Sequence, residues 1–480
     1  MVYSSTQGVA VKTLPWKYAT TEVFSHFSQR PWAILLDSAN AEHVDARYDI
    51  ICIDPIATIV TQGDTTLITH LPQTSAMQQP QFKSEHGVEH SNADPFALLK
   101  QLIKRYFPES KACHLPFSGG AVGAFSYDLG RRLESLPNIA EKDIDLPEMN
   151  VGIYPWALIF DSHTQQWSMV HYHGEAQLQW QLAQIEQALA SMPSHAPFAL
   201  TSDWQAQIDV TDYHAKFNAV QAYLHSGDCY QINLTQRFMA NYQGDEWLAY
   251  QTLRQSNGAP FSAFIRLAHH ALLSISPERF IQLREDQIQT KPIKGTLPRA
   301  ADPIADRNAA AQLASSEKDR AENLMIVDLL RNDIGKVAKP GSVNVPSLFA
   351  IESFPAVHHL VSTVTATLDV GYHASDLLRA AFPGGSITGA PKIRAMAIIE
   401  ELEPSRRSLY CGSIGYLSQD GQMDTSITIR TLVAEHQRLY CWAGGGIVAD
   451  SQVDAEYQES YDKVSKILPV LAKSHDTGRV

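Results

Sequence analysis

The chain has 480 residues and a formal net charge of −13 at pH 7, with 44% hydrophobic and 19% charged residues. These are ordinary values for a globular protein, and a chain of this length can bury a large core. The acidic balance argues against sequence-independent nucleic-acid binding and against an acidic membrane surface as partner, because both need basic patches. A small anionic ligand would need a local cationic pocket.

Cysteine usage and the N-terminus bear on the compartment. The five cysteines are odd in number and form no Cys-x-x-Cys pair, which disfavours a disulfide framework or a zinc site. The first residues lack a basic segment followed by an apolar one, so we expect no signal peptide. No run approaches the about 18 apolar residues that a membrane helix needs. We therefore expect a cytoplasmic protein with no membrane or nucleic-acid partner.

Strand-like and helical patterns are mixed along the whole chain. Strands are predicted at residues 32–36, 156–160, 271–275, 425–431 and 438–442, and helices at 213–225 and 317–330. The polar, proline-containing stretches 73–94 and 191–205 are predicted loops. The second loop separates a predicted N-terminal domain, 15–190, from a predicted C-terminal domain, 206–473. The mixture favours an α+β or α/β fold, and no Walker loop or Gly-x-Gly-x-x-Gly motif indicates a nucleotide site.

The helical pattern at 317–330 carries a carboxylate on its apolar face. Ser316-x-x-Asp319 resembles a capping box, and Gly335 is a plausible end. Glu322 shares a face with apolar residues, which costs several kcal/mol unless the carboxylate is paired or bound to a metal. Alternatively, Glu322 is an acidic residue near the helix start that the helix dipole favours.

The run 425–431 alternates in polarity. Ile427 and Ile429 would point to one side of a strand, and Ser426, Thr428 and Arg430 to the other. Such a strand could present a guanidinium group to a carboxylate in two hydrogen bonds. An outer, solvated face explains the pattern equally well.

Two glycine-rich segments follow predicted elements. Gly444-Gly445-Gly446 comes after the predicted strand 438–442, and residues 382–392 read Phe-Pro-Gly-Gly-Ser-Ile-Thr-Gly-Ala-Pro-Lys. Glycines let backbone N–H groups approach an anion closely, although plain turns also use them.

The C-terminal helical pattern places three charged residues on one face. Glu456, Glu459 and Lys463 follow at i, i+3 and i+7, beside an apolar stripe that should face the core. Two carboxylates and an amine could hold a divalent metal and an anion, and Mg²⁺ would suit carboxylates supplied by two helices. A solvated face with an ordinary Glu-Lys pair is the alternative.

These segments occur in an order that resembles a known family. Ser276-Pro277-Glu278 and Pro-Ile-Lys294-Gly-Thr-Leu-Pro precede the motifs above. Residues from about 210 to 470 are similar to the catalytic domain of chorismate-utilising enzymes. Residues 20–170, with Leu-Leu-Asp-Ser at 35–38 and Gly-Gly-Ala-Val-Gly at 119–123, are similar to the N-terminal domain of anthranilate and aminodeoxychorismate synthases. The resemblance implies an α+β (α/β sandwich) fold with layered, largely antiparallel sheets and outer helices.

The resemblance also implies roles for individual residues. The implied Mg²⁺ ligands are Glu322 and Glu459, with Glu456 just behind them. The implied contacts to the carboxylates of chorismate are Arg430, Tyr416, Lys463 and the backbone amides of Gly444, Gly445 and Gly446. The implied pocket walls are Gly295, Thr296 and Thr388, with His359 near the departing 4-hydroxyl group. Glu278 is implied as the general acid that protonates this hydroxyl, which requires a pKa above its usual value of about 4.3.

Lys294 distinguishes between products within the family. Anthranilate synthases carry alanine at this position, whereas in aminodeoxychorismate synthases the lysine amine attacks C2 and the 4-hydroxyl leaves. Ammonia then enters at C4 and expels the lysine. The attacking amine must be neutral, so its pKa of about 10.4 must be lowered by burial or by nearby cations. The resemblance therefore favours synthesis of 4-amino-4-deoxychorismate, a precursor of 4-aminobenzoate and folate.

Two features that the sequence lacks bear on the identity and the source of the attacking nucleophile. Isochorismate and salicylate synthases activate water with a lysine at the position of Gln231, which argues against water as the nucleophile here. The chain also lacks a Gly-x-Cys-x-Gly glutaminase motif, so we expect ammonia to come from a separate glutamine amidotransferase subunit. The alternatives are component I of an anthranilate synthase and a non-catalytic, tryptophan-binding regulatory subunit.

A tryptophan site is also implied. Anthranilate synthases bind L-tryptophan in a site built partly on Leu-Leu-Glu-Ser and Asn-Pro-x-Pro-Tyr segments, which here read Leu-Leu-Asp-Ser and Ala-Pro-Phe-Ser. The corresponding residues are Ser38, Asp45, Ala46, Arg47, Tyr48, Pro260, Phe261 and Ser262. A regulatory tryptophan, a structural tryptophan and an empty apolar core remain open.

Overall fold

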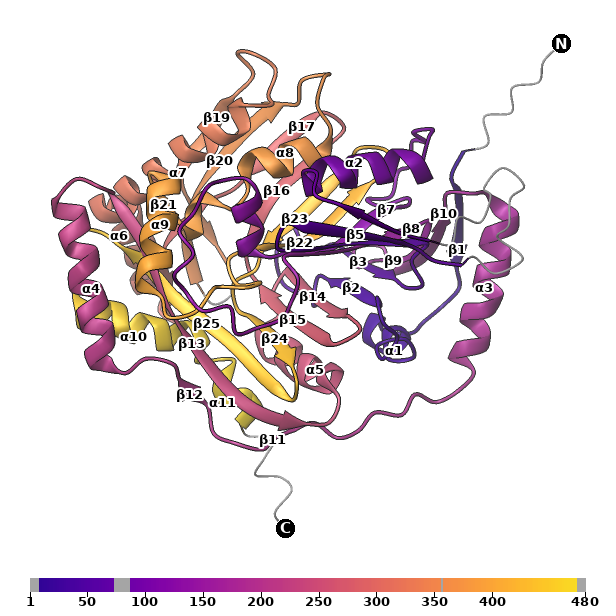
Figure 1. Cartoon of the computed structure of the whole chain (residues 1–480), viewed down its shortest axis with the longest axis horizontal. Helices are drawn as coiled ribbons and strands as arrows, with labels where there is room; N and C mark the ends of the chain where they lie inside the picture. Colours follow the sequence, from indigo (N-terminus) through magenta and orange to yellow (C-terminus); the bar gives the residue numbers. More distant parts are fainter. Residues whose placement is uncertain (1–7, 73–86, 355–356, 473–480) are drawn as a thin grey trace.

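The computed structural model describes residues 8–72, 87–354 and 357–472, which form two large β-sheets with helices outside them (Figure 1). Every pair of named strands is antiparallel. The first sheet follows the order β1 (Ala10–Leu14), β10 (Gln166–His171), β9 (Trp156–Asp161), β3 (Tyr48–Cys52), β2 (Ile34–Asp37), β14 (Phe261–Arg266), β15 (His270–Ser276), β24 (Thr431–Glu435), β25 (Arg438–Ile447), β13 (Gln231–Gln243) and β11 (Ala199–Leu200). The short strands β12 (Gln205–Ala206) and β21 (Gly389–Ala390) also pair with β13.

The second sheet contains the remaining strands. Its order is β18 (Ile293–Pro298), β20 (Val357–Thr367), β17 (Gln287–Thr290), β16 (Arg279–Arg284), β23 (Met423–Ile427), β22 (Ser413–Ser418), β7 (Gly120–Phe125), β8 (Met149–Tyr154), β4 (Ala57–Gln62), β5 (Thr65–His70) and β6 (Gly87–Ser91). Strand β19 (Asn344–Ser353) pairs with β20. The sheets confirm the predicted α+β class with largely antiparallel layers.

Apolar side chains of both sheets meet in one core, which includes Val122 of β7 and Ala263 of β14. Helices α2 (Pro95–Tyr106), α7 (Glu317–Gly335) and α8 (Ala374–Ala381) add to this core. A second core lies under α1 (Thr20–Ser25), α3 (Glu175–Leu189), α5 (Glu246–Asn257) and α11 (Leu468–Ala472). A third joins α4 (Val210–His225) and α9 (Lys392–Leu402) to β13. The remaining helices are α6 (Pro303–Ser315), α10 (Val453–Val464) and the 3₁₀ helices η2 (Tyr127–Arg132) and η3 (Gly385–Ile387).

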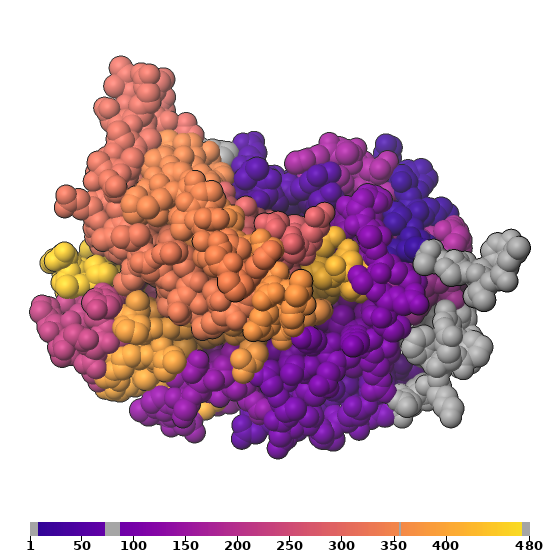
Figure 2. Space-filling model, turned by 90° about the horizontal axis from the view of Figure 1, so that it is seen from above, coloured from indigo at the N-terminus to yellow at the C-terminus, as the bar shows by residue number. Residues whose placement is uncertain are grey.

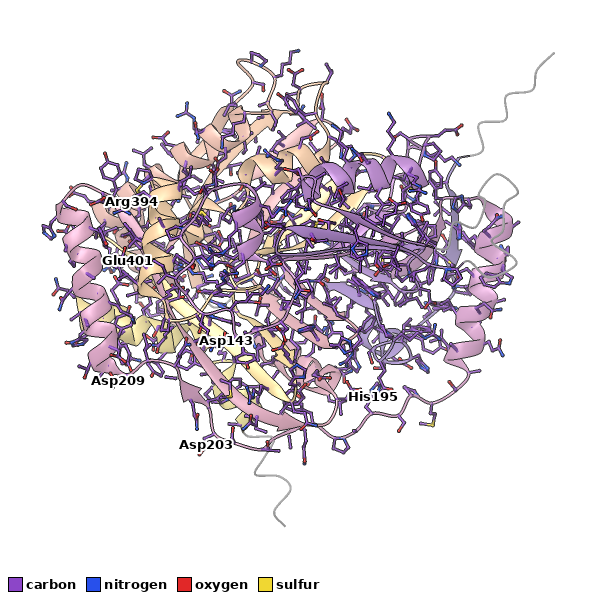
Figure 3. The ribbon with its side chains drawn as sticks, in the orientation of Figure 1. Asp143, His195, Asp203, Asp209, Arg394 and Glu401 are labelled. Atoms are coloured by element: carbon purple, nitrogen blue, oxygen red, sulfur yellow. The ribbon has the colours of Figure 1, made fainter. Side chains whose placement is uncertain are left out.

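The two segments predicted as domains share both sheets. In the first sheet, β2 pairs with β14, so that Leu36 lies opposite Ala263. In the second, β7 pairs with β22, so that Gly123 lies opposite Gly415. Figure 2 accordingly shows purple N-terminal and orange C-terminal residues forming one continuous surface. The linker between α3 and α4 crosses the lower edge of the molecule, where His195, Asp203 and Asp209 mark its course in Figure 3.

Most predicted elements are confirmed. The strands at 32–36, 156–160, 271–275 and 438–442 correspond to β2, β9, β15 and β25, and the two helices to α4 and α7. Ser316 caps α7, since its hydroxyl accepts a hydrogen bond from the Asp319 N–H, and the helix ends at Gly335. Of the predicted loop 73–94, residues 73–86 lie outside the described part of the chain. The loop is wrong at Gly87–Ser91, which pair with β5 as strand β6.

The single strand predicted at 425–431 is wrong. Strand β23 ends at Ile427 in the second sheet, and β24 begins at Thr431 in the first. The residues between them break the strand, because Arg430 adopts a left-handed backbone with φ of 51°. Alternating polarity identified extended backbone on both sides but gave no sign of the change of sheet.

No helix within the described residues combines the length and the apolarity that a membrane span requires.

Candidate active site

Glu278 and Arg430 lie where the chain passes between the two sheets. The first crossing joins β15 to β16 and contains Glu278, and the second joins β23 to β24 and contains Arg430. The crossings are side by side, because the N–H of Ile427 donates to the carbonyl of Glu278 (3.0 Å) and that of Ile275 to the carbonyl of Arg430 (3.0 Å). The carboxylate of Glu278 and the guanidinium group of Arg430, about 150 residues apart in sequence, therefore lie in the same region of the structure.

Lys294 reaches the same place from the edge of the second sheet. The pairing of β18 with β20 shifts register between Ile293 and Thr296, so Lys294 and Gly295 lie in an irregular segment that can redirect a side chain. Gly295 has φ of 77°, and an added Cβ there would lie 2.8 Å from Asp319. Both the left-handed backbone and the close packing therefore require glycine beside Lys294.

Ser386 in η3 contacts both Lys294 and Glu278. The ammonium nitrogen of Lys294 donates to the Ser386 carbonyl (3.4 Å), and the Ser386 hydroxyl donates to Glu278 Oε1 (3.2 Å). Both titratable side chains are half-buried. The serine thus joins the two groups that the sequence assigns to acid and nucleophile.

Burial shifts both groups toward their uncharged forms. It raises the pKa of Glu278 to about 7, although the nearby Lys294, Ser386, Lys463 and Arg430 act in the opposite direction. Burial also lowers the pKa of Lys294, while Glu322 is the main opposing charge. A protonated carboxyl and a neutral amine are the states that a proton donor and a nucleophile need.

Charged side chains of α10 lie beside the glycines of β25. A methyl group added to Gly445 would lie 3.1 Å from both Glu456 Oε2 and Glu459 Oε1, and 3.5 Å from Lys463 Nζ. Lys463 pairs with Glu459 (2.6 Å) and also donates to the Gly444 carbonyl (2.7 Å). Close packing of these groups explains glycine at 445.

Glu322 faces these carboxylates from α7. Burial raises its pKa, and the charge of Glu456 adds to the increase. Burial likewise raises the pKa of Glu456, against a hydrogen bond from Ser451 and with a contribution from Glu459. Glu456 thus has an acidic neighbour on either side, Glu322 and the exposed Glu459, and carboxylate oxygens are the ligands that a hard divalent cation such as Mg²⁺ prefers. The three side chains have the donor chemistry of the expected metal, although they do not bring three ligand atoms within 4.8 Å of one another.

Among the described residues, only Asp145, Glu435 and His436 bring three ligand-type atoms within 4.8 Å of one another. Glu435 Oε1 already accepts hydrogen bonds from the Asp145 N–H and from His270 (both 2.8 Å). These contacts explain the group without a metal, and it is separate from the carboxylates on α7 and α10.

The remaining residues predicted for the pocket wall form hydrogen bonds with their neighbours. His359 Nδ1 lies 2.8 Å from the Thr296 hydroxyl across the β18–β20 pair. Burial lowers the pKa of His359 to about 4, and Arg430 adds to this effect, so the imidazole is neutral at pH 7. The Thr388 hydroxyl donates to the Gly384 carbonyl (3.1 Å), which holds the glycine-rich turn in shape.

The structure places Tyr416 apart from this group, contrary to the expectation that it binds the same carboxylates. Its hydroxyl accepts a hydrogen bond from Arg284 (2.7 Å), and its ring packs edge-on against Phe117. Because side chains alternate along β22, Tyr416 points to the same side as Ile414, and both line a separate cavity of about 260 Å³.

This second cavity gathers most of the residues predicted for tryptophan. Its lining includes Asp45, Arg47, Tyr48, Pro260, Phe261 and Ser262. Ser38 and Ala46, the other two residues predicted for tryptophan, are not among the lining residues. The N–H and hydroxyl of Ser38 instead donate to Asp49 (2.7 and 2.6 Å), and Ala46 is buried within its loop.

Ser386 and three charged residues in the second cavity are absent from the predicted sites. Arg279 joins Asp45 (2.7 Å) to Asp424 (2.9 Å) in the wall of that cavity, and Arg284 lines it as well. Arg279 directly follows Glu278, so strand alternation could have indicated that the two face opposite sides. Nothing in the local sequence distinguishes Ser386 from an ordinary turn serine.

The elevated pKa of Glu278 predicts a pH-dependent stability. Its ordinary pKa is 4.5 and its folded pKa about 7, so the folded state binds more protons between these values and loses stability as the pH rises through this window. Glu278→Gln removes this loss. We expect the variant to gain about 1–3 kcal/mol over the wild type between pH 4.5 and pH 8, allowing for partial solvation.

Denaturant unfolding of both proteins at several pH values measures this difference. Glu285→Gln, at an exposed turn, is the matched control and should track the wild type. A constant offset between the Glu278→Gln variant and the wild type over this pH range would contradict the raised pKa.

The chain is similar to known proteins over nearly its whole length. A family model described as chorismate binding enzyme matches residues 33–469. The chain is 57% identical over 465 residues to aminodeoxychorismate synthase component 1 of Klebsiella aerogenes, covering 96% of this chain and 99% of the relative. It is 55% identical over 469 residues to the protein of that name in Escherichia coli strain K12, covering 97% and 99%. The crystal structure of anthranilate synthase component I from Streptococcus pneumoniae TIGR4 superposes with a TM-score of 0.76 at 30% identity, covering 89% of this chain and 93% of that one. The chain therefore belongs to the family of chorismate binding enzymes.

Proposed function

We propose that the chain converts chorismate and ammonia to 4-amino-4-deoxychorismate, as component 1 of an aminodeoxychorismate synthase. The observation that carries the proposal is the placement of Lys294 and Glu278 on either side of Ser386, with both pKa values shifted toward the uncharged forms. The names of the relatives from Klebsiella aerogenes and Escherichia coli support it. The product would serve 4-aminobenzoate and folate synthesis.

In the proposed reaction Lys294 is the nucleophile. Its neutral amine forms a bond to C2, while the bond from C4 to the hydroxyl oxygen breaks and Glu278 gives that oxygen a proton. Ammonia then bonds to C4 as the bond from C2 to the lysine nitrogen breaks, which restores the free lysine. The two displacements place nitrogen at C4.

The neighbouring groups would bind the two carboxylates of chorismate. Lys463 and Arg430 supply positive charge in a chain whose net charge is −13. Burial of Arg430 strengthens its interaction with an anion, because fewer water molecules compete for the guanidinium group. Glu322, Glu456 and Glu459 would hold Mg²⁺, which neutralises the ring carboxylate when bound. His359 would contact the departing hydroxyl as a neutral imidazole.

Ammonia would come from a separate glutamine amidotransferase subunit, which the designation component 1 of the relatives suggests. We place this assembly in the cytoplasm. All five cysteines are free, as a reducing compartment would keep them.

Lys294→Ala should lower the formation of 4-amino-4-deoxychorismate at least about a hundredfold, because no other amine occupies its place. Chorismate binding should change little. The assay contains purified protein, chorismate, Mg²⁺ and ammonium, with the product identified by mass spectrometry and by conversion to 4-aminobenzoate with aminodeoxychorismate lyase.

Lys291→Ala is the matched control, since Lys291 pairs with Glu352 (2.6 Å), and it should retain wild-type turnover. Unchanged turnover in Lys294→Ala would rule out the covalent route. Anthranilate as the wild-type product would instead favour the anthranilate synthase alternative.

Glu459→Gln should raise the Mg²⁺ concentration needed for half-maximal activity by about tenfold or more, because a ligand carboxylate is lost. Calorimetric titration of Mg²⁺ into the protein without substrate should show the same weakening. Asp462→Asn, exposed on the same helix, should match the wild type in both measurements. An unaltered Mg²⁺ affinity in Glu459→Gln would remove Glu459 from the ligand set.

The second cavity suits an aromatic, zwitterionic amino acid, and we assign it to L-tryptophan. Its wall combines the carboxylates of Asp45 and Asp424 with the guanidinium group of Arg284 and the rings of Tyr48 and Phe261. Its volume of about 260 Å³ exceeds that of an indole side chain.

Calorimetry should detect binding of L-tryptophan to the wild type, and Asp45→Asn should weaken it by about tenfold, which corresponds to about 1.4 kcal/mol. L-leucine, which lacks the ring, is the control ligand and should bind more weakly. No heat with L-tryptophan would favour an empty or purely structural cavity.

A further inference from the structure

Ser386 occupies a turn that is held from several sides. The Ile387 carbonyl accepts hydrogen bonds from Arg407 (2.9 Å) and from the Asn233 side chain (3.0 Å). A Cβ added to Gly384 would lie 2.8 Å from Ile427, and one added to Gly385 would collide with Leu329. The turn is therefore wedged between β23 and α7, and its position is set before any substrate binds.

The turn presents two groups of Ser386 to the reacting side chains. The carbonyl accepts from Lys294 and the hydroxyl donates to Glu278 Oε1. The hydroxyl donor is the side chain of a half-buried residue, so substitution can remove it without touching the carbonyl. The two contacts can thus be separated by experiment.

We propose that Ser386 is a positioning residue for the reaction, whose hydroxyl selects the oxygen of Glu278 that carries the proton and whose carbonyl orients the Lys294 amine. This role rests on the proposed function. Ser386 itself makes and breaks no covalent bond.

The effect on Glu278 follows from hydrogen-bond directions. When Glu278 is protonated, the oxygen that accepts from Ser386 acts as the carbonyl oxygen of the carboxylic acid, because an accepted hydrogen bond favours the unprotonated oxygen. The transferable proton then resides on Oε2. Without the serine hydroxyl, the proton could occupy either oxygen, and only one of them would point to the leaving group.

The effect on Lys294 is similar. A neutral amine has two N–H groups and one lone pair, and the hydrogen bond to the Ser386 carbonyl engages one N–H group. The lone pair is thereby directed away from the turn. Orientation of a nucleophile before the reaction lowers the entropy cost of reaching the transition state.

The charged groups that face Glu278 come from three elements. They are Lys294 of β18, Lys463 of α10 and Arg430 between β23 and β24. All three favour the ionised carboxylate, as does the hydrogen bond from Ser386. Loss of the serine hydroxyl leaves the three cations in place and removes only the hydrogen bond, so Glu278 should keep its proton to a higher pH.

Ser386→Ala is the test, with Ser386→Thr as the conservative variant that keeps the hydroxyl. Ser413→Ala is the matched control, because the buried Ser413 hydroxyl donates to the Ser426 carbonyl instead (2.7 Å). The assay measures kcat and the KM for chorismate from pH 5.5 to 9, with saturating Mg²⁺ and ammonium. Infrared difference titration, referenced to Glu278→Gln, follows the carboxyl group of Glu278 in each variant.

We expect kcat of Ser386→Ala to fall about tenfold or more. This loss is a part of the about 10²–10⁴-fold that general acid catalysis contributes as a whole. KM should stay within about twofold of the wild type. The alkaline limb of log kcat and the infrared titration of Glu278 should both move to higher pH. Ser386→Thr should restore kcat and both titrations, and Ser413→Ala should leave them unchanged.

Wild-type kcat and titration in Ser386→Ala would overturn the role of Ser386 and leave the proposed function intact. Ser386→Ala could instead lower kcat without moving either titration, and Ser386→Thr could fail to restore kcat. That result would mean that Ser386 is merely structural, and it would also overturn the proposed role. A wild type that makes no 4-amino-4-deoxychorismate would overturn the proposed function, and this role with it.

Discussion

The buried ion pair between Arg407 and Glu403 is the interaction on which the site depends. Arg407 is 1% exposed, and its guanidinium group lies 2.7 Å from Glu403. It also donates to the carbonyls of Ile387 and Asn233 (2.9 and 2.6 Å), while Glu403 accepts from the N–H and hydroxyl of Thr235 (3.0 and 2.8 Å). Removing one member of such a pair leaves an uncompensated buried charge, which costs about 3–5 kcal/mol. The pair thus ties α9, β13 and the turn with Ser386 into one unit.

The first sheet crossing links the group around Glu278 to the second cavity. Glu278 directly precedes β16, and Arg279 is the first residue of that strand. Glu278 faces Lys294, whereas Arg279 joins Asp45 to Asp424 beside the second cavity. An occupant of the second cavity would therefore lie beside Arg279, the residue that directly follows Glu278. This adjacency is the physical link between the second cavity and the group around Glu278.

The electrostatics of the site resolve the apparent conflict between an acidic protein and an anionic substrate. Lys294, Lys463 and Arg430 surround Glu278, although the chain as a whole carries a charge of −13. Burial raises the pKa of Glu278 to about 7 and so makes its ionised form unfavourable. Burial of this carboxyl group is therefore destabilising once it ionises, and the large shared core offsets this cost.

Local patterns in the sequence determined the elements, and the resemblance of the ordered motifs to a known family implied the chemistry. The Ser316 cap, the periodicity of α4 and α7 and the residue types at 278 and 294 are readable from short segments, because helix and strand periods depend on near neighbours. The strand break at Arg430, the place of Tyr416 beside Arg284, the sharing of both sheets by the two predicted domains and the contacts of Ser386 depended on the tertiary structure. Each results from strand register, from a crossing between sheets or from packing between residues far apart in the chain, and local periodicity carries no information about these.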